Sequence, residues 1–226
     1  MGAIKLNIVD ELENALVVPR QRLTECELVQ RFMTGTLKRE HYILFLWETF
    51  HFVRFTPVHL RMAAARMPEG PLQERFLEHA REEGGHDLWA LQDLAALGVN
   101  TKMVKESLPL PATIELIAYE RYTATKLEPM ALLGLEYGME GFTASAGGPA
   151  LAALEQSLNL GKDATRFLRR HAELDAHHVE EGAEALCEFV HTPAQREAVL
   201  RNARESMMRY TAMYDGICAA AREMGV

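Results

Sequence analysis

The chain has 226 residues, 48% of them hydrophobic and 25% charged, which fits one sizeable globular domain and is short for two. The formal net charge of -8 argues against a general nucleic-acid binder, because such a protein needs a basic face. No run of about 18 apolar residues predicts a membrane span, and the acids ahead of the first apolar run do not fit a signal peptide.

The cysteines point to a reducing compartment. Cys26, Cys187 and Cys218 are odd in number and widely spaced, so they predict a cytoplasmic protein without a disulfide framework. No pair of them has the spacing of a zinc site.

Helical periodicity dominates the chain, and no segment shows clean strand alternation between turn signals. We therefore predict an all-α fold of about seven to eight helices. The expected helices lie near 6–17, 24–34, 38–66, 72–97, 112–146, 150–158, 163–190 and 194–223. Pro57 and Pro129 are expected to bend or break two of these helices, and Thr192 is expected to cap the last one.

The stretch "LWETFHFVRFTP", residues 46–57, places two titratable groups among aromatic side chains. Glu48 is a candidate metal ligand in that apolar setting. His51 is more readily explained as a core histidine or as a partner that supports a ligand. The aromatic residues themselves fit an ordinary core.

The stretch "HAREEGGHDLW" begins at residue 79 and contains Glu83 and His86 at i and i+3. This Glu-x-x-His spacing lets one helix offer a carboxylate and an imidazole to one ion, as in di-iron helical bundles. Gly84 and Gly85 cost about 1 kcal/mol each inside a helix, so close approach of another helix or a ligand is one explanation for them. Glu82 is a second candidate, and a solvated helix face is the alternative.

In "LEYGMEGFTASAGG", residues 135–148, Glu136 and Glu140 lie one turn apart among apolar and small residues. A carboxylate without a partner in a core is costly, whereas one that bridges two cations is not. One of these acids is thus either a ligand or the partner of an arginine.

The stretch "HAELDAHHVEE", residues 171–181, gathers three imidazoles and four carboxylates. His171, Asp175 and His178 share one helix face at i, i+4 and i+7, and the axial rise between the two histidines is about 10.5 Å. That span suits two ions about 3.5–4 Å apart better than one ion. A charged surface that is rich in histidine is the alternative. No thiolate occurs among these candidates, which favours iron or manganese over structural zinc.

In chain order these residues resemble the ligand pattern of the heme-oxygenase-like di-iron oxidases. That pattern is a Glu, then Glu-x-x-His, then a lone Glu, then His-x-x-x-Asp-x-x-His. Here it falls on Glu48, Glu83, His86, Glu140, His171, Asp175 and His178. The segment "GTLKREHYILFLWETFHFVRF" is also similar to the first core helix of the wider superfamily, which includes TenA-type thiaminases and the cofactorless oxidase of pyrroloquinoline quinone synthesis.

The resemblance implies a single heme-oxygenase-like domain over 1–226, and two non-heme iron ions that are partly or wholly lost on isolation. Glu83, His86 and His171 would hold mainly one ion and Asp175 with His178 the other, with Glu140 as a bridge. Glu140 is favoured over Glu136 by its Glu-Gly stretch, and Glu48 would add a catalytic carboxylate. The implied partners are O2 and a small organic substrate of amino-acid, acyl or aromatic type. Neither nucleic acid nor membrane is expected, and a homodimer is consistent with the superfamily.

The sequence is also compatible with two other classes of protein. A ferritin-like di-iron bundle would take its last ligands from Glu188 and His191, and a metal-free helical scaffold would need none. Heme oxygenase and TenA thiaminase themselves fit less well. Residues 20–37 contain no histidine for a heme, and residues 112–146 contain no cysteine nucleophile.

Overall fold

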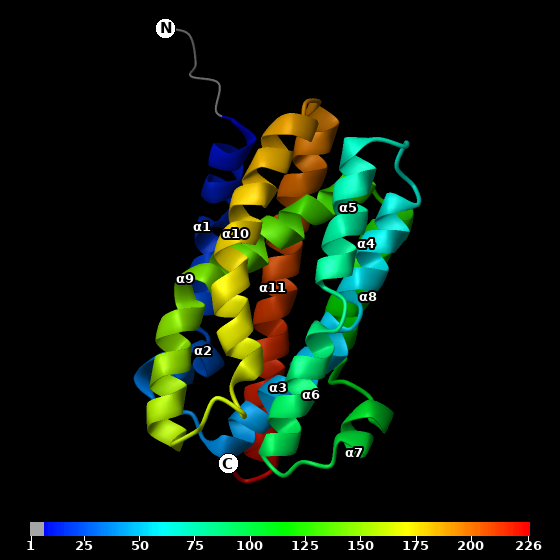
Figure 1. Ribbon diagram of the computed structural model, residues 1–226. Helices are drawn as coiled ribbons and strands as arrows, with labels where there is room; N and C mark the ends of the chain where they lie inside the picture. Colours follow the sequence, from blue (N-terminus) through cyan, green and yellow to red (C-terminus); the bar gives the residue numbers. More distant parts are fainter. Residues whose placement is uncertain (1–6) are drawn as a thin grey trace, which may run out of the picture.

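The computed structural model describes residues 7–226, which form helices joined by short connections and contain no strand (Figure 1). The all-α prediction is confirmed. In order, the helices are α1 (Ile8–Glu25), α2 (Glu27–Thr34), α3 (Arg39–Val53), α4 (Thr56–Ala64), α5 (Pro71–Glu82), α6 (His86–Ala96), α7 (Thr101–Glu106), α8 (Pro111–Lys126), the short 3-10 helix η1 (Pro129–Ala131), α9 (Leu132–Leu158), α10 (Arg166–Phe189) and α11 (Pro193–Glu223). No helix among the described residues is long and apolar enough to cross a membrane. Residue 6, the predicted start of the first helix, lies outside the described residues.

The helix count exceeds the predicted seven to eight because predicted helices divide. The helix expected over 38–66 stops at Val53 and restarts at Thr56, with Pro57 in the first turn of α4, where its missing N–H costs nothing. The helix expected over 72–97 divides at Gly85, whose φ of 95° is left-handed. The six-residue α7, which Asn100 caps, was not predicted.

In α9, by contrast, segments of two predicted helices form one continuous helix. A break was expected between 112–146 and 150–158, but α9 runs on through Pro149 to Leu158. The preceding chain instead breaks at Pro129, as predicted, and η1 leads directly into α9. The unbroken helix places Glu140 about two turns after its start and about five turns before its end, on a rigid base.

Helix α11 is the central element of the bundle. Figure 1 shows it running lengthwise through the middle, with α1 and α10 on one side and α4, α5 and α8 on the other, while α9 crosses it from one side to the other. Its buried residues recur every three or four positions, which gives a continuous apolar stripe. They are Ala198, Val199, Asn202, Ala203, Ser206, Met207, Tyr210, Met213, Tyr214, Ile217, Cys218 and Ala221.

The start of α10 is fixed by a side chain from α6. Asp93 is fully buried, and its carboxylate accepts hydrogen bonds from the backbone N–H groups of Arg166 at 3.0 Å and Phe167 at 2.8 Å. A carboxylate at a helix N-terminus satisfies free donors and complements the helix dipole. This contact joins α6 to α10 one turn before His171, so it sets that histidine opposite α6.

A buried carboxyl between α8 and α11 gives the fold a testable pH dependence. Glu120 is fully buried and accepts hydrogen bonds from Ser206 and Asn202, and burial raises its pKa from 4.5 to about 7. A raised folded-state pKa means that the stabilisation is full below about pH 4.5 and is lost as the pH rises through about 7. We expect the free energy of unfolding to fall by up to about 3 kcal/mol from this group over that range.

Urea unfolding at a series of pH values tests this expectation. Glu120→Gln keeps both hydrogen bonds without a titrating group, so it should lose that part of the slope. Glu115→Gln, an exposed position on the same helix, should keep the wild-type slope. Equal slopes for wild type and Glu120→Gln would contradict the prediction.

Candidate metal centre

Three side chains from neighbouring segments form the first candidate metal site, which we call site A. Glu83, His86 and His171 place ligand atoms within 4.8 Å of one another. Glu83 directly follows α5 and His86 begins α6, so the two side chains are brought together by a turn and not by one continuous helix. The prediction that Gly84 and Gly85 lie inside a helix is therefore wrong. Gly85 supplies the left-handed residue of the turn that leaves Nδ1 of His86 3.2 Å from Oε1 of Glu83.

A second group, site B, consists of His79, Glu140 and His178, again with ligand atoms within 4.8 Å. Nε2 of His79 lies 3.4 Å and Nδ1 of His178 lies 3.8 Å from Oε1 of Glu140. Nε2 of His79 is also 3.9 Å from Oε1 of Glu83 in site A, so the two sites adjoin. Neighbouring sites with mixed imidazole and carboxylate donors are suited to a pair of ions.

His79 was not among the residues predicted from the sequence. A signal was present, because His79 and Glu83 stand at i and i+4 and therefore share one face of α5. The Glu-x-x-His motif begins at Glu83 and continues to His86, so it does not include His79.

Several potential ligand atoms in these two sites have no hydrogen-bond partner. Among the described residues, buried polar atoms without a hydrogen bond include Nε2 of His79, Nδ1 of His86, Oε2 of Glu140 and Nδ1 of His178. An unsatisfied buried donor or acceptor costs about 1–3 kcal/mol. One cation in each site would supply partners for these atoms, so the side chains fit a metal centre with two ions. Nitrogen and oxygen donors without a thiolate suit iron or manganese.

Glu136 and Glu140 have different environments, which separates two residues that the sequence left as alternatives. Glu136 accepts a hydrogen bond from Arg75 at 2.9 Å and lies 3.2 Å from Nδ1 of His79. Burial would raise its pKa, but His79 and Arg75 lower it to about 2. Burial raises the pKa of Glu140 to about 8. Glu140 therefore belongs to the cluster, while Glu136 orients His79 in the manner of a carboxylate that supports a metal-bound imidazole.

His171 and Asp175 both come from α10. Nδ1 of His171 lies 3.0 Å from the carbonyl of Phe167, which can only accept, so this nitrogen is the donor and Nε2 is left for a ligand bond. Asp175 is buried and accepts a hydrogen bond from Thr143 of α9. Asp175 is in neither cluster of three, but it lines the same cavity, and burial raises its pKa to about 7.

Other predicted residues lie elsewhere. Glu48 is buried, but its carboxylate accepts hydrogen bonds from Thr113 and from the backbone N–H of Leu110, and it does not line the cavity. This arrangement ties α3 to the start of α8 and does not support the catalytic role expected for Glu48. His51 contacts Ser107 at 3.0 Å. Glu82 is half exposed, with Oε2 3.8 Å from Nε2 of His178.

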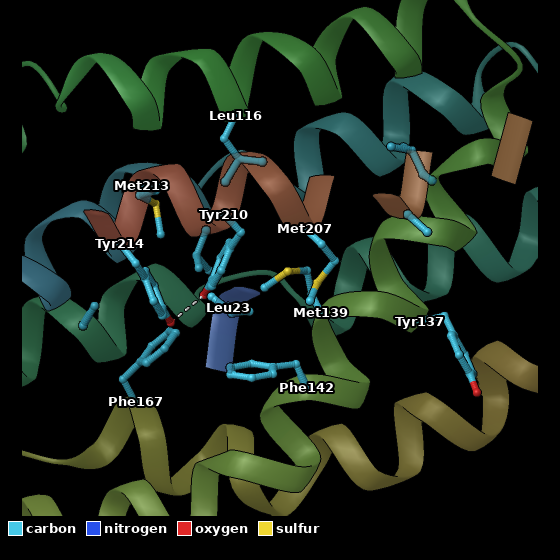
Figure 2. Close-up of a cluster of buried hydrophobic side chains, with 14 of the residues drawn as sticks. Leu23, Leu116, Tyr137, Met139, Phe142, Phe167, Met207, Tyr210, Met213 and Tyr214 are labelled. Atoms are coloured by element: carbon cyan, nitrogen blue, oxygen red, sulfur yellow. Dashed lines mark hydrogen bonds between the residues drawn. The ribbon is translucent and has the colours of Figure 1, made fainter. Parts of the chain in front are cut away.

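Both sites border a cavity of about 130 Å³. Its other walls are mainly apolar and come from α3, α9, α10 and α11; they include Phe45, Phe52, Leu135, Met139, Phe167 and Tyr214. Figure 2 shows how several of these side chains converge, with the hydroxyl of Tyr214 3.3 Å from that of Tyr210. The arrangement places candidate ligands at one end of a pocket that suits an apolar molecule.

Sequence comparison agrees with this description. Residues 43–211 match the model of a family described as iron-containing redox enzyme, and since the match spans most of the chain, the protein belongs to that family. No curated protein matches the sequence significantly.

Solved structures confirm the predicted heme-oxygenase-like fold. A domain of unknown function with that fold from Shewanella denitrificans has a TM-score of 0.89 and 24% identity over 98% of this chain and 96% of its own. A TenA homolog from Pseudomonas syringae has a TM-score of 0.81 and 16% sequence identity, over 94% of this chain and 93% of its own. Heme oxygenase-1 from the cyanobacterium Synechocystis, in complex with heme, has a TM-score of 0.73 and 15% sequence identity over 97% of each chain. The fold rules out the ferritin-like alternative, whose expected ligands Glu188 and His191 are exposed.

Proposed function

We propose that this protein is an O2-dependent non-heme di-iron oxidoreductase that oxidises a small organic substrate. One observation carries the proposal: two adjoining clusters of histidine and carboxylate, with ligand atoms lacking partners, border an apolar cavity. Membership of an iron-containing redox family supports it.

Each of the two sites would have its own set of three ligands. Glu83, His86 and His171 would hold one iron, and His79, Glu140 and His178 the other. Bound iron would supply the capacity to reduce oxygen and withdraw electrons from the substrate. Asp175 is buried at the cavity wall, so its carboxyl group is placed to hold or release a proton next to the substrate.

The cavity favours an apolar acyl or aromatic group. Phe45, Phe52 and Phe167 supply its aromatic surface, and none of the described residues that line it is Lys or Arg. Heme fits poorly, because buried carboxylates such as Glu83 would face its apolar ring and its own carboxylates would lack a cation. A thiaminase-like nucleophile has no support, since no cysteine lines the cavity.

The test is anaerobic addition of iron(II) to the purified protein, followed by metal counting and mixing with oxygen. We expect about two irons per chain, oxygen consumption and a transient visible absorbance. The His79→Ala/His86→Ala double variant serves as the control and should show none of these. Failure of the wild-type protein to bind iron would reject the proposal and favour a metal-free helical binding protein.

A further inference from the structure

A second hollow, a groove of about 310 Å³, lies between α5 and α10 and is separate from the apolar cavity. Its lining includes five carboxylates: Glu78 and Glu82 from α5, and Glu181, Glu184 and Glu188 from α10. Arg75 also lines the groove but pairs with Glu136, and Arg81 pairs with Glu78, so the lining holds five carboxylates and one arginine. The groove therefore presents a net negative surface.

The inner end of this groove is a wall of site B. His79 lines both the groove and the cavity, is only 5% exposed, and has no hydrogen-bond partner on Nε2. The imidazole of His178 stands between outer and inner carboxylates. Its Nε2 is 3.8 Å from Oε2 of Glu82, and its Nδ1 is 3.8 Å from Oε1 of Glu140. Oxygen and nitrogen donors thus continue from the surface to the buried cluster.

We propose that this groove is the path by which iron(II) reaches site B. The proposal rests on the di-iron function above. A groove lined by one sign of charge concentrates counter-ions and can raise association rates by 10-fold or more. The apolar cavity is a poor route for a hydrated cation, because its walls cannot replace the lost hydration. Cation and organic substrate would then approach the centre from different sides.

Stopped-flow mixing of the full-length apoprotein with anaerobic iron(II) tests the path. Protein-bound iron is counted after the reaction is quenched at set times, which reports the filling of both sites. Trp89 stacks on His86 of site A at 4.0 Å between ring centroids, so its fluorescence distinguishes the filling of site A from that of site B. The test variant is Glu181→Gln/Glu184→Gln/Glu188→Gln, which leaves all six cluster residues intact. The control is Glu106→Gln/Glu115→Gln/Glu223→Gln, which removes the same charge. Glu106 on α7 and Glu223 near the C-terminus lie at the opposite end of the bundle (Figure 1).

We expect the groove variant to bind iron about 10-fold more slowly at low salt, with unchanged final stoichiometry. Added salt should slow the wild type more than this variant. The control should keep the wild-type rate. Equal rates for wild type and groove variant, or equal slowing in both triple variants, would overturn the path while leaving the di-iron function standing. Absence of iron binding by the wild type would reject the di-iron function and the path together.

Discussion

Replacing His79 by alanine is expected to remove one of two irons per chain and to weaken binding at site B by about 100-fold or more. Removing a partner of a ligand typically costs 10–100-fold in metal affinity, and removing the ligand itself should cost at least as much. Site B would keep only Glu140 and His178, while site A would be intact. Metal counting after iron(II) loading measures the result, and substrate-dependent oxygen uptake should fall in parallel.

A nearby histidine provides the control for this prediction. The His177 side chain is 70% exposed and contacts Glu181 at 3.1 Å, outside both clusters, so His177→Ala should retain two irons. His86→Ala should remove the other iron. Asp175→Ala is the informative comparison, because the family resemblance makes Asp175 a ligand whereas the geometry groups His79 with Glu140 and His178. Loss of iron from Asp175→Ala with full retention in His79→Ala would show that the resemblance identifies the ligand and the geometry does not.

The parts of the site that could be predicted from the sequence are those governed by helical spacing. His171, Asp175 and His178 stand on one face of α10, because their positions differ by four and seven residues and the helix is unbroken. Glu136 and Glu140 could likewise be recognised as buried acids from their apolar surroundings. What spacing cannot supply is the identity of the partner. Arg75 reaches Glu136 from 61 residues away, and that contact separates the two acids.

Glu48 is a second buried acid whose partner could not be identified from the sequence. Its apolar neighbours correctly indicate a buried carboxylate, and the resemblance gave it a place beside the metals. The backbone N–H of Leu110 and the hydroxyl of Thr113, more than sixty residues later, satisfy it instead. A buried acid is therefore evidence for a partner, but the nature of that partner depends on tertiary contacts.

The two glycines between Glu83 and His86 mark a helix end. Because Gly84 and Gly85 are costly inside a helix, α5 ends before them and α6 begins after them. The turn makes the site possible, because a new helix starts at His86 and its ring stacks on Trp89. In α9, Gly147 is the residue of the small-residue run 144–148 that lines the cavity. The glycine with the tightest packing is Gly134, ten residues before that run.

Gly134→Ala is expected to destabilise the protein by at least about 3 kcal/mol, or to prevent folding, because overpacking against rigid groups costs 1–3 kcal/mol or more. A Cβ on Gly134 would lie 2.3 Å from the carbonyl oxygen of Val199 and 2.9 Å from the backbone nitrogen of Ala203. Both are backbone atoms of α11, so relief requires α9 and α11 to move apart. Urea unfolding and the yield of folded protein measure the effect, and iron content should also fall because α9 carries Glu140.

The matched control is Gly216→Ala within α11. A Cβ there would meet Ala112 at 3.7 Å and Leu110 at 3.9 Å, which are ordinary contacts. Alanine is favoured over glycine inside a helix by up to about 1 kcal/mol, so this variant should be as stable as wild type or more so. The contrast between the two variants depends on the crossing of α9 and α11 and not on glycine itself. Equal stability of both variants would show that these helices do not pack closely at Gly134, and the placement of Glu140 opposite His79 would have to be revised with them.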